Sequence, residues 1–125
     1  VDLSGFHRDR ATSDGYRCQC KKCRHHSLFL YYTSPEGKYV SYKNRAGKKG
    51  LDFEIDFELF KSLTLSKCEY CGGEGYGVDR IDSSKGYTTC NCAPCCSKCN
   101  FSKQSLSVEE FEELIIKIAK HRNLF

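Results

Sequence analysis

The apolar residues near the end of the chain recur with the period of an α-helix. They occupy positions i, i+3, i+4 and i+7 of the helical template: Phe111, Leu114, Ile115 and Ile118. Ser107 and Glu110 have the spacing of a capping box, in which each side chain binds the backbone N–H of the other residue. The pattern predicts a C-terminal helix within residues 105–125. We expect its apolar face to pack in the core.

Two shorter helices are predicted in the middle of the chain. Ser34 and Pro35 suit the cap and the first turn of a helix. Asp56 can cap a short helix over residues 57–63, with Phe57 and Phe60 facing inward.

A β-hairpin and a helix are predicted after these elements. Residues 78–81 have the pattern of a strand end, residues 82–86 that of a polar loop, and residues 86–89 that of the start of the next strand. Pro94 suits the first turn of a helix. This helix would carry four polar or ligating side chains: Cys96, Cys99, Asn100 and Lys103.

Composition limits the class of protein. A chain of 125 residues fits one domain with a modest core. No apolar run approaches the ~20 residues of a membrane span, and the first residues lack the pattern of a signal peptide. The chain has ten cysteines, and their Cys-x-x-Cys pairs favour metal thiolates over disulfides, so we expect a reducing, cytoplasmic environment. The net charge of +4 is mild, and its placement matters more than its size.

Two Cys-x-x-Cys pairs bracket the predicted hairpin. The pairs are Cys68 with Cys71 and Cys96 with Cys99. Thiolates two residues apart can bind one tetrahedral ion from a single tight turn. The two pairs therefore predict one structural four-sulfur zinc site, which would also stabilise a small core.

A second zinc site is predicted in the polar, basic segment 1–26, where Cys20 and Cys23 have ligand spacing. Its other two ligands stay open at this stage. The candidates are Cys18, Cys90, Cys92, His25 and His26. The set we favour combines Cys18, Cys20, Cys23 and Cys90.

The motifs between and around the cysteine pairs resemble the HNH, or ββα-metal, endonuclease superfamily, and most closely its phage-type and PacI-like restriction branch. The residues that carry the resemblance are Cys68-x-x-Cys71, Asp79-Arg80, Asn91, Cys96-x-x-Cys99-Asn100 and Lys103. The chain departs from the family in two ways. Arg80 stands where the superfamily has a histidine, and no cysteine precedes Cys18.

The resemblance implies an α+β fold, a small zinc-stabilised ββα-metal nuclease fold with flanking helices, in a single domain over residues 1–125. Within it we expect four segments: a zinc module over 1–26, a basic helical connector over 27–66, a catalytic core over 67–104, and the C-terminal helix. The implied activity is metal-dependent hydrolysis of DNA phosphodiester bonds that leaves 5′-phosphate and 3′-hydroxyl ends.

Site residues follow from this chemistry. Asp79 and Asn100 are oxygen donors that suit Mg²⁺ or Mn²⁺, and the resemblance assigns the single catalytic ion to them. Arg80 stays protonated, so it can grip a phosphate but cannot act as the base. Tyr70 is our candidate base, with His25, His26 or bulk water as alternatives. Asn91 completes the candidate catalytic set, although loop-pinning is the simpler role for it.

Double-stranded DNA is the expected partner, and restriction-type relatives suggest a homodimer. The candidate phosphate contacts are Arg17, Lys43, Arg45, Lys48, Lys49 and Lys103. The main alternative is a zinc-containing module that binds nucleic acid without cutting it. A zinc-stabilised protein-interaction domain is a further alternative, and it predicts no salt-sensitive binding of DNA.

Overall fold

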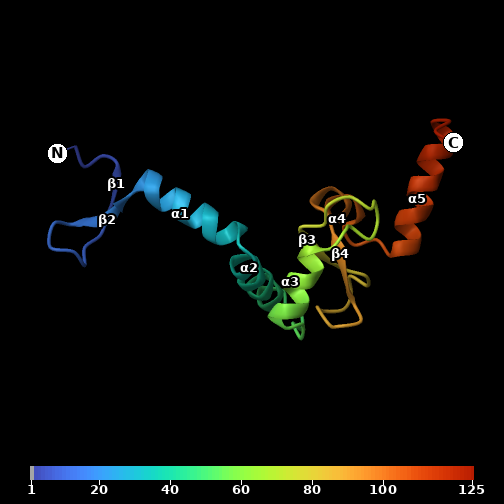
Figure 1. Cartoon of the computed structure of the whole chain (residues 1–125), viewed down its shortest axis with the longest axis horizontal. Coiled ribbons are helices and arrows are strands. Elements are labelled where there is room, and N and C mark those ends of the chain that lie inside the picture. The colour runs from blue at the N-terminus through green and yellow to red at the C-terminus, as the bar shows by residue number, and fades with distance from the viewer. Residues whose placement is uncertain (1) are drawn as a thin grey trace. The chain divides into compact units, whose positions relative to one another are not determined.

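The computed structural model describes residues 2–125 and has a mixed α+β fold (Figure 1). The chain forms two compact units, Val1–Lys38 and Tyr39–Phe125, which we describe separately. Helix α2 (Pro35–Lys48) contains the boundary between the units. The predicted segment boundaries after residues 26, 66 and 104 stay predictions.

The N-terminal unit is a hairpin followed by a helix. Strands β1 (Phe6–Arg8) and β2 (Tyr16–Cys20) pair antiparallel, with Arg8 opposite Tyr16. Helix α1 (Lys21–Thr33) follows β2 directly, and the sulfur of Cys20 caps it by accepting the N–H of Cys23 at 3.3 Å. No hydrophobic side chain is buried within residues 2–38.

The C-terminal unit has a small aromatic core. Ile55, Phe60 and Val78 are buried at its centre. Aromatic rings pack edge-to-face around them: Tyr39, Tyr42, Phe53 and Tyr87. These residues come from α2, from α3 (Phe57–Leu65), from β3 (Gly77–Arg80) and from loops. Ser34 and Asp56 cap their helices as predicted, each side chain accepting a backbone N–H.

The second strand of the hairpin was predicted in the wrong place. Strand β3 pairs with β4 (Cys92–Cys95), not with residues 86–89. Gly86 and Tyr87 lie instead against Asp52, whose carbonyl accepts the N–H of Tyr87 at 2.8 Å. A Cβ at Gly86 would approach the Asp52 carbonyl oxygen to 2.4 Å, so the glycine serves this contact and does not begin the strand.

The helix after the hairpin also begins later than predicted. Pro94 lies in β4, opposite Val78, and α4 (Ser97–Lys103) begins three residues after it. The carbonyl of Pro94 accepts the N–H of Glu69 at 2.9 Å, which holds it in the strand. Cys96 is the N-cap of α4, a role that the sequence pattern gave to no residue.

Helix α5 (Val108–His121) confirms the predicted helix and its capping box. The expectation that its apolar face packs in the core was largely wrong. Phe111 is buried against Tyr70, but the next residues of the stripe, Leu114, Ile115 and Ile118, are 43%, 47% and 51% exposed. The helix extends beyond the part of the core that covers Phe111.

None of the helices within residues 2–125 has the length and apolar character that a membrane crossing requires.

Candidate functional site

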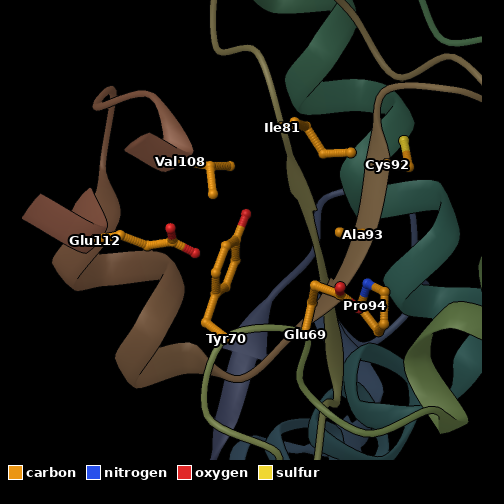
Figure 2. Close-up of a pocket in the computed structure, with 8 residues that line it drawn as sticks. All are labelled: Glu69, Tyr70, Ile81, Cys92, Ala93, Pro94, Val108 and Glu112. Carbon is orange, nitrogen blue, oxygen red and sulfur yellow. The ribbon is translucent and has the colours of Figure 1, made fainter. Parts of the chain in front are cut away.

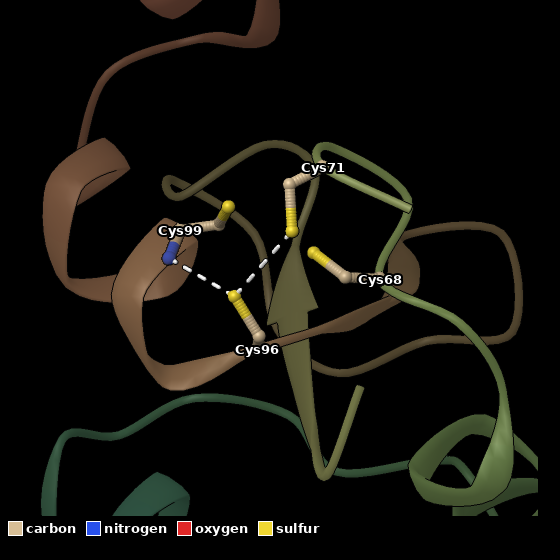
Figure 3. Close-up of side chains that lie close together, drawn as sticks. All are labelled: Cys68, Cys71, Cys96 and Cys99. Atoms are coloured by element: carbon tan, nitrogen blue, oxygen red, sulfur yellow. Dashed lines mark hydrogen bonds between the residues drawn. The ribbon is translucent and has the colours of Figure 1, made fainter. Parts of the chain in front are cut away.

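Four cysteines bring their sulfur atoms together at one end of the hairpin. The Sγ atoms of Cys68, Cys71, Cys96 and Cys99 all lie within 4.8 Å of one another (Figure 3). Cys71 Sγ and Cys96 Sγ are 3.8 Å apart. A tetrahedral zinc with Zn–S bonds of ~2.3 Å would place its sulfurs ~3.8 Å apart. The cluster therefore fits the predicted zinc site and could hold that ion.

Two local structures build this cluster. The first is a turn in which the Cys68 carbonyl accepts the Gly72 N–H at 2.9 Å, and Gly72 adopts a φ of 69° that suits glycine. The second is the start of α4, where Cys96 Sγ accepts the N–H of Cys99 at 3.4 Å. Each Cys-x-x-Cys pair is therefore shaped by hydrogen bonds of its own local backbone.

Backbone N–H groups favour the thiolate form of Cys68, whereas burial and the neighbouring sulfurs raise the pKa of Cys99. Burial alone would raise the pKa of Cys68, but the N–H groups of Cys96, Cys71 and Tyr70 outweigh it and lower this pKa to about 6. Thiolate is the form that binds metal.

A second polar centre is formed around Asp79 on β3. The carboxylate is almost completely buried. Its Oδ2 atom accepts the hydroxyl proton of Tyr70 at 2.7 Å and pairs with Lys103 Nζ at 3.1 Å. Oδ1 takes part in neither contact. The charge of Asp79 is thus stabilised by one neutral donor and one cation.

Lys103 is not the DNA contact that the sequence suggested. Its side chain has no exposed area, and Nζ also donates to the backbone carbonyl of Arg80 at 3.1 Å. A fully buried ammonium is out of reach of a DNA phosphate. The structure therefore replaces the phosphate role of Lys103 with that of a buried partner of Asp79.

Asp79, Arg80 and Asn100 line one cleft of about 390 Å³. The cleft also receives Arg45 from α2 and Lys49 from the turn that follows this helix. The N–H of Lys49 donates to the carbonyl of Arg45 at 3.2 Å, which holds the two residues close together. Three of the predicted catalytic residues and two of the predicted phosphate contacts therefore come together, from β3, α4, α2 and the turn after α2.

Arg80 and Asn91 organise the loop beside this cleft. Arg80 donates from Nη1 to the carbonyls of Ser83 and Lys85 at 2.7 and 2.8 Å. Asn91 is buried, accepts the N–H of Asp82, and donates to the carbonyls of Asp82 and Gly86. Asn91 is absent from the lining of the cleft, and its hydrogen bonds indicate the loop-pinning role.

Tyr70 does not line this cleft and lines instead a separate cavity of about 380 Å³ with residues of β4 and α5 (Figure 2). Burial, followed by the hydrogen bond to Asp79, raises the pKa of Tyr70 above its ordinary value of 10.0. In this arrangement the phenol is a hydrogen-bond donor to Asp79.

The other predicted site residues lie on the surface. Lys43 and Lys48 are exposed on α2, and Arg17 pairs with Asp9 at 3.5 Å in the N-terminal unit. Cys18, Cys20 and Cys23 belong to the N-terminal unit and Cys90 to the C-terminal unit. The four-sulfur cluster is the one group of three or more metal-ligating side chains found within residues 2–125. The second zinc stays a prediction.

Sequence reasoning missed Tyr42, Ser83, Gln104 and Ser105 in the cleft lining. It also missed the buried position of Lys103, although a signal for it exists. Lys103 follows Cys99 by four residues, so the two share a helix face. Because Cys99 must point toward the zinc site, that face is an inner one.

Comparison with known proteins gives two similarities, although no protein-family model matches the chain. "Uncharacterized protein R423" of Acanthamoeba polyphaga mimivirus is 38% identical over 95 residues, which is 73% of this chain. The chain spans only 18% of the length of that viral protein.

The second similarity is to a solved structure, that of the rare-cutting HNH restriction endonuclease PacI, which was studied for its mechanism of DNA perturbation. It is 23% identical, with a TM-score of 0.52, and the match covers 97% of this chain and 88% of the other. The likeness shows that the two chains share a fold. The resemblance to the HNH superfamily is thus supported at the level of the fold.

Proposed function

We propose that this chain is a metal-dependent DNA endonuclease with a single-metal site, of restriction or phage type. One observation carries the proposal: Asp79, Arg80 and Asn100 line the same cleft as Arg45 and Lys49. This cleft combines oxygen ligands for a cation with a basic wall for a polyanion. The shared fold with PacI supports the same function.

Asp79 and Asn100 would hold the catalytic ion. A carboxylate and an amide oxygen are hard donors that fit Mg²⁺ or Mn²⁺, and both residues border the cleft. Bound there, such an ion would stabilise charge on the phosphate and the leaving oxygen. Tyr70 and Lys103 hold the Asp79 carboxylate in place through Oδ2.

Arg45, Lys49 and Arg80 would bind the phosphates of the substrate. All three are cationic side chains, and all three line the cleft. We keep Lys43, Lys48 and Arg17 as outer contacts to the backbone of double-stranded DNA. These contacts carry no sequence information.

Tyr70 is the proposed base, and its environment defines the test. Because its pKa is raised, the phenol is protonated in this arrangement and donates its proton to Asp79. Tyr70→Phe removes the hydroxyl and keeps the ring that packs on Phe111. If Tyr70 takes the proton of the attacking water, cutting should fall by ~10²–10⁴ with DNA binding retained. An unchanged cutting rate assigns the proton to solvent or to a histidine.

A homodimer is part of the proposal. The exposed stripe of Leu114, Ile115 and Ile118 on α5 is an apolar surface of the kind found at subunit interfaces. Charges along α5 change sign from its first half (Glu109 to Glu113) to its second (Lys117 to Arg122). Two copies paired antiparallel would therefore place acidic against basic residues.

A nicking assay tests the function directly. The full chain, loaded with zinc, should convert supercoiled plasmid to open circles when Mg²⁺ is added. Asp79→Ala should abolish this activity, while Asp52→Ala, which removes an exposed carboxylate outside the cleft, should not. Cutting by the Asp79→Ala variant at the normal rate excludes the proposed site.

The alternative is a zinc-containing module that binds nucleic acid without cutting it. The position of Arg80 favours this alternative, because Nη1 is bound to two loop carbonyls and a guanidinium cannot accept a proton. Salt-sensitive DNA binding without nicking, in Mg²⁺ and in Mn²⁺, is the result that would select it.

A further inference from the structure

A cavity of about 260 Å³ in the N-terminal unit is lined by four basic side chains. They are His7, Arg8, Arg17 and Arg24. All four belong to the unit Val1–Lys38, so the cavity does not depend on the C-terminal unit. No acidic side chain is among its lining residues within the described part of this unit.

Three consecutive elements bring these side chains together. His7 and Arg8 lie on β1, Arg17 lies on β2, and Arg24 lies in the first turns of α1. The Arg8 guanidinium lies 5.1 Å from the centre of the Tyr16 ring on the opposite strand. This cation–π contact holds Arg8 at the hairpin. The spacing of the cations is therefore set by the hairpin and its junction with α1.

A neighbouring cavity of about 490 Å³ extends the basic surface. His7 and Arg24 line both cavities, and the second adds Lys21, Lys22 and His25. A bound polyanion could therefore contact cations over more than one phosphate.

The positive charge of this surface is poorly compensated within the unit. Asp9 pairs with Arg17 at 3.5 Å. Asp2 and Asp14 are instead engaged with nearby backbone N–H groups. The first turn of α1 has no acidic residue. The cations there oppose the helix dipole, whose positive end lies at the N-terminus. An anion would relieve this repulsion.

We propose that the cavity formed by His7, Arg8, Arg17 and Arg24 binds phosphate groups of a nucleic-acid backbone, as an anchoring site separate from the cleft at Asp79. Arginine forks suit phosphate oxygens, and several cations on a rigid hairpin can contact successive phosphates. In taking DNA as the ligand the inference rests on the proposed function, but it requires no catalysis.

The experiment uses the full, zinc-loaded chain and a fluorescein-labelled DNA duplex without Mg²⁺, so that nothing is cut. Anisotropy titrations between 50 and 200 mM salt give the slope of log K against log salt. Removing two phosphate contacts with Arg8→Ala and Arg24→Ala together should lower the magnitude of this slope by ~1.8 and weaken binding to all sequences alike.

Matched variants distinguish the loss of a specific phosphate contact from a general loss of positive charge. Arg10→Ala removes one exposed arginine of the same unit that does not line the cavity, so affinity and slope should stay at the wild-type values. Arg24→Lys keeps the charge and should retain most of the slope that Arg24→Ala loses. Circular dichroism confirms that each variant is folded.

Two results overturn the inference: a double variant that binds like the wild type, or an Arg10→Ala variant that loses as much as Arg24→Ala. The plasmid assay keeps this inference distinct from the proposed function. If the wild type cuts plasmid but its DNA binding does not depend on Arg8 and Arg24, only the anchoring-site inference is rejected. If DNA binding depends on Arg8 and Arg24 but no plasmid is cut, only the nuclease proposal is rejected.

Discussion

The two units of the chain use similar residues in opposite ways. The C-terminal unit buries aromatic rings around Ile55, Phe60 and Val78. In the N-terminal unit the aromatic run on α1 stays exposed, with Phe29 at 59% and Tyr32 at 57%. Burial holds the side chains of the C-terminal unit in one arrangement, and a catalytic site requires side chains that are fixed in this way. The N-terminal unit is organised by a hairpin, a helix cap and surface charge.

This difference separates the tasks that each unit can perform. A buried carboxylate with defined donors, like that of Asp79, requires an interior. A phosphate anchor requires only that cations stand close together in water. On the proposed function, the C-terminal unit would carry the chemistry and the N-terminal unit would be a surface for binding.

The largest effect should come from breaking the cysteine cluster. Cys96→Ser removes one sulfur of the cluster, while serine can still serve as the N-cap of α4, so the loss of the zinc ligand should unfold the C-terminal unit. Structural zinc contributes about 10–16 kcal/mol, which is as much as the whole stability of a typical domain. We expect loss of bound zinc and of helical circular dichroism.

Ser102→Ala is the control for this variant, because Ser102 is an exposed residue of α4 outside the cluster. Elemental analysis should give about two zinc ions per chain if the N-terminal site also forms. A folded, metal-free Cys96→Ser protein would show that the aromatic core is enough to stabilise the C-terminal unit without zinc.

The next effect concerns the buried ion pair. Lys103→Met keeps the length of the side chain but leaves Asp79 buried without its cation. Removing one partner of a buried pair costs about 3–5 kcal/mol. Urea unfolding should show this loss, whereas Lys98→Met, at an exposed position of the same helix, should change stability by less than about 0.5 kcal/mol. Equal stabilities of the two variants would mean that Lys103 is not enclosed.

Local sequence signals predicted much of the C-terminal unit. The caps at Ser34, Asp56 and Ser107 mark the starts of α2, α3 and α5, since capping depends only on neighbouring residues. The Cys-x-x-Cys spacing predicted the sulfur cluster for the same reason. The place of β4 was missed because the contact of Gly86 with Asp52 joins residues far apart in sequence.

The sequence also could not show which apolar surfaces stay exposed. The stripe on α5 has a strong helical period, and that period is the same whether the face meets a core or another chain. Only the tertiary arrangement shows that Phe111 is covered and Ile118 is not. Lys103 is the converse case, a charged side chain that is fully buried. A lysine is seldom fully buried without a partner, so its sequence position alone favours an exposed side chain.

The exposed stripe on α5 provides a third prediction. If it joins two copies of the chain, Leu114→Glu should convert a dimer to a monomer without unfolding either unit. Ile116→Glu is the control, since Ile116 is 45% exposed but lies off the stripe by its helical position. Sedimentation velocity separates the two outcomes, and a monomeric wild type at micromolar concentration contradicts the dimer.

The smallest effect tests how well the C-terminal unit excludes water. Burial, followed by the charge of Asp79, raises the pKa of Cys92 to about 11 from an ordinary value of 9.0. The neutral thiol is therefore favoured by folding. Its contribution to stability is complete below pH 9.0 and is lost as the pH rises from 9.0 to about 11.

Alkylation kinetics measure this pKa, because only the thiolate reacts. The rate at Cys92, followed by peptide mass spectrometry, should rise about tenfold per pH unit through pH 10 in the folded protein. In the unfolded, chelator-treated chain the same rate should level off near the ordinary value of 9.0. A plateau near that value in the folded protein would place Cys92 in water. The interior that distinguishes the C-terminal unit from the N-terminal unit would then be open beside Asp79.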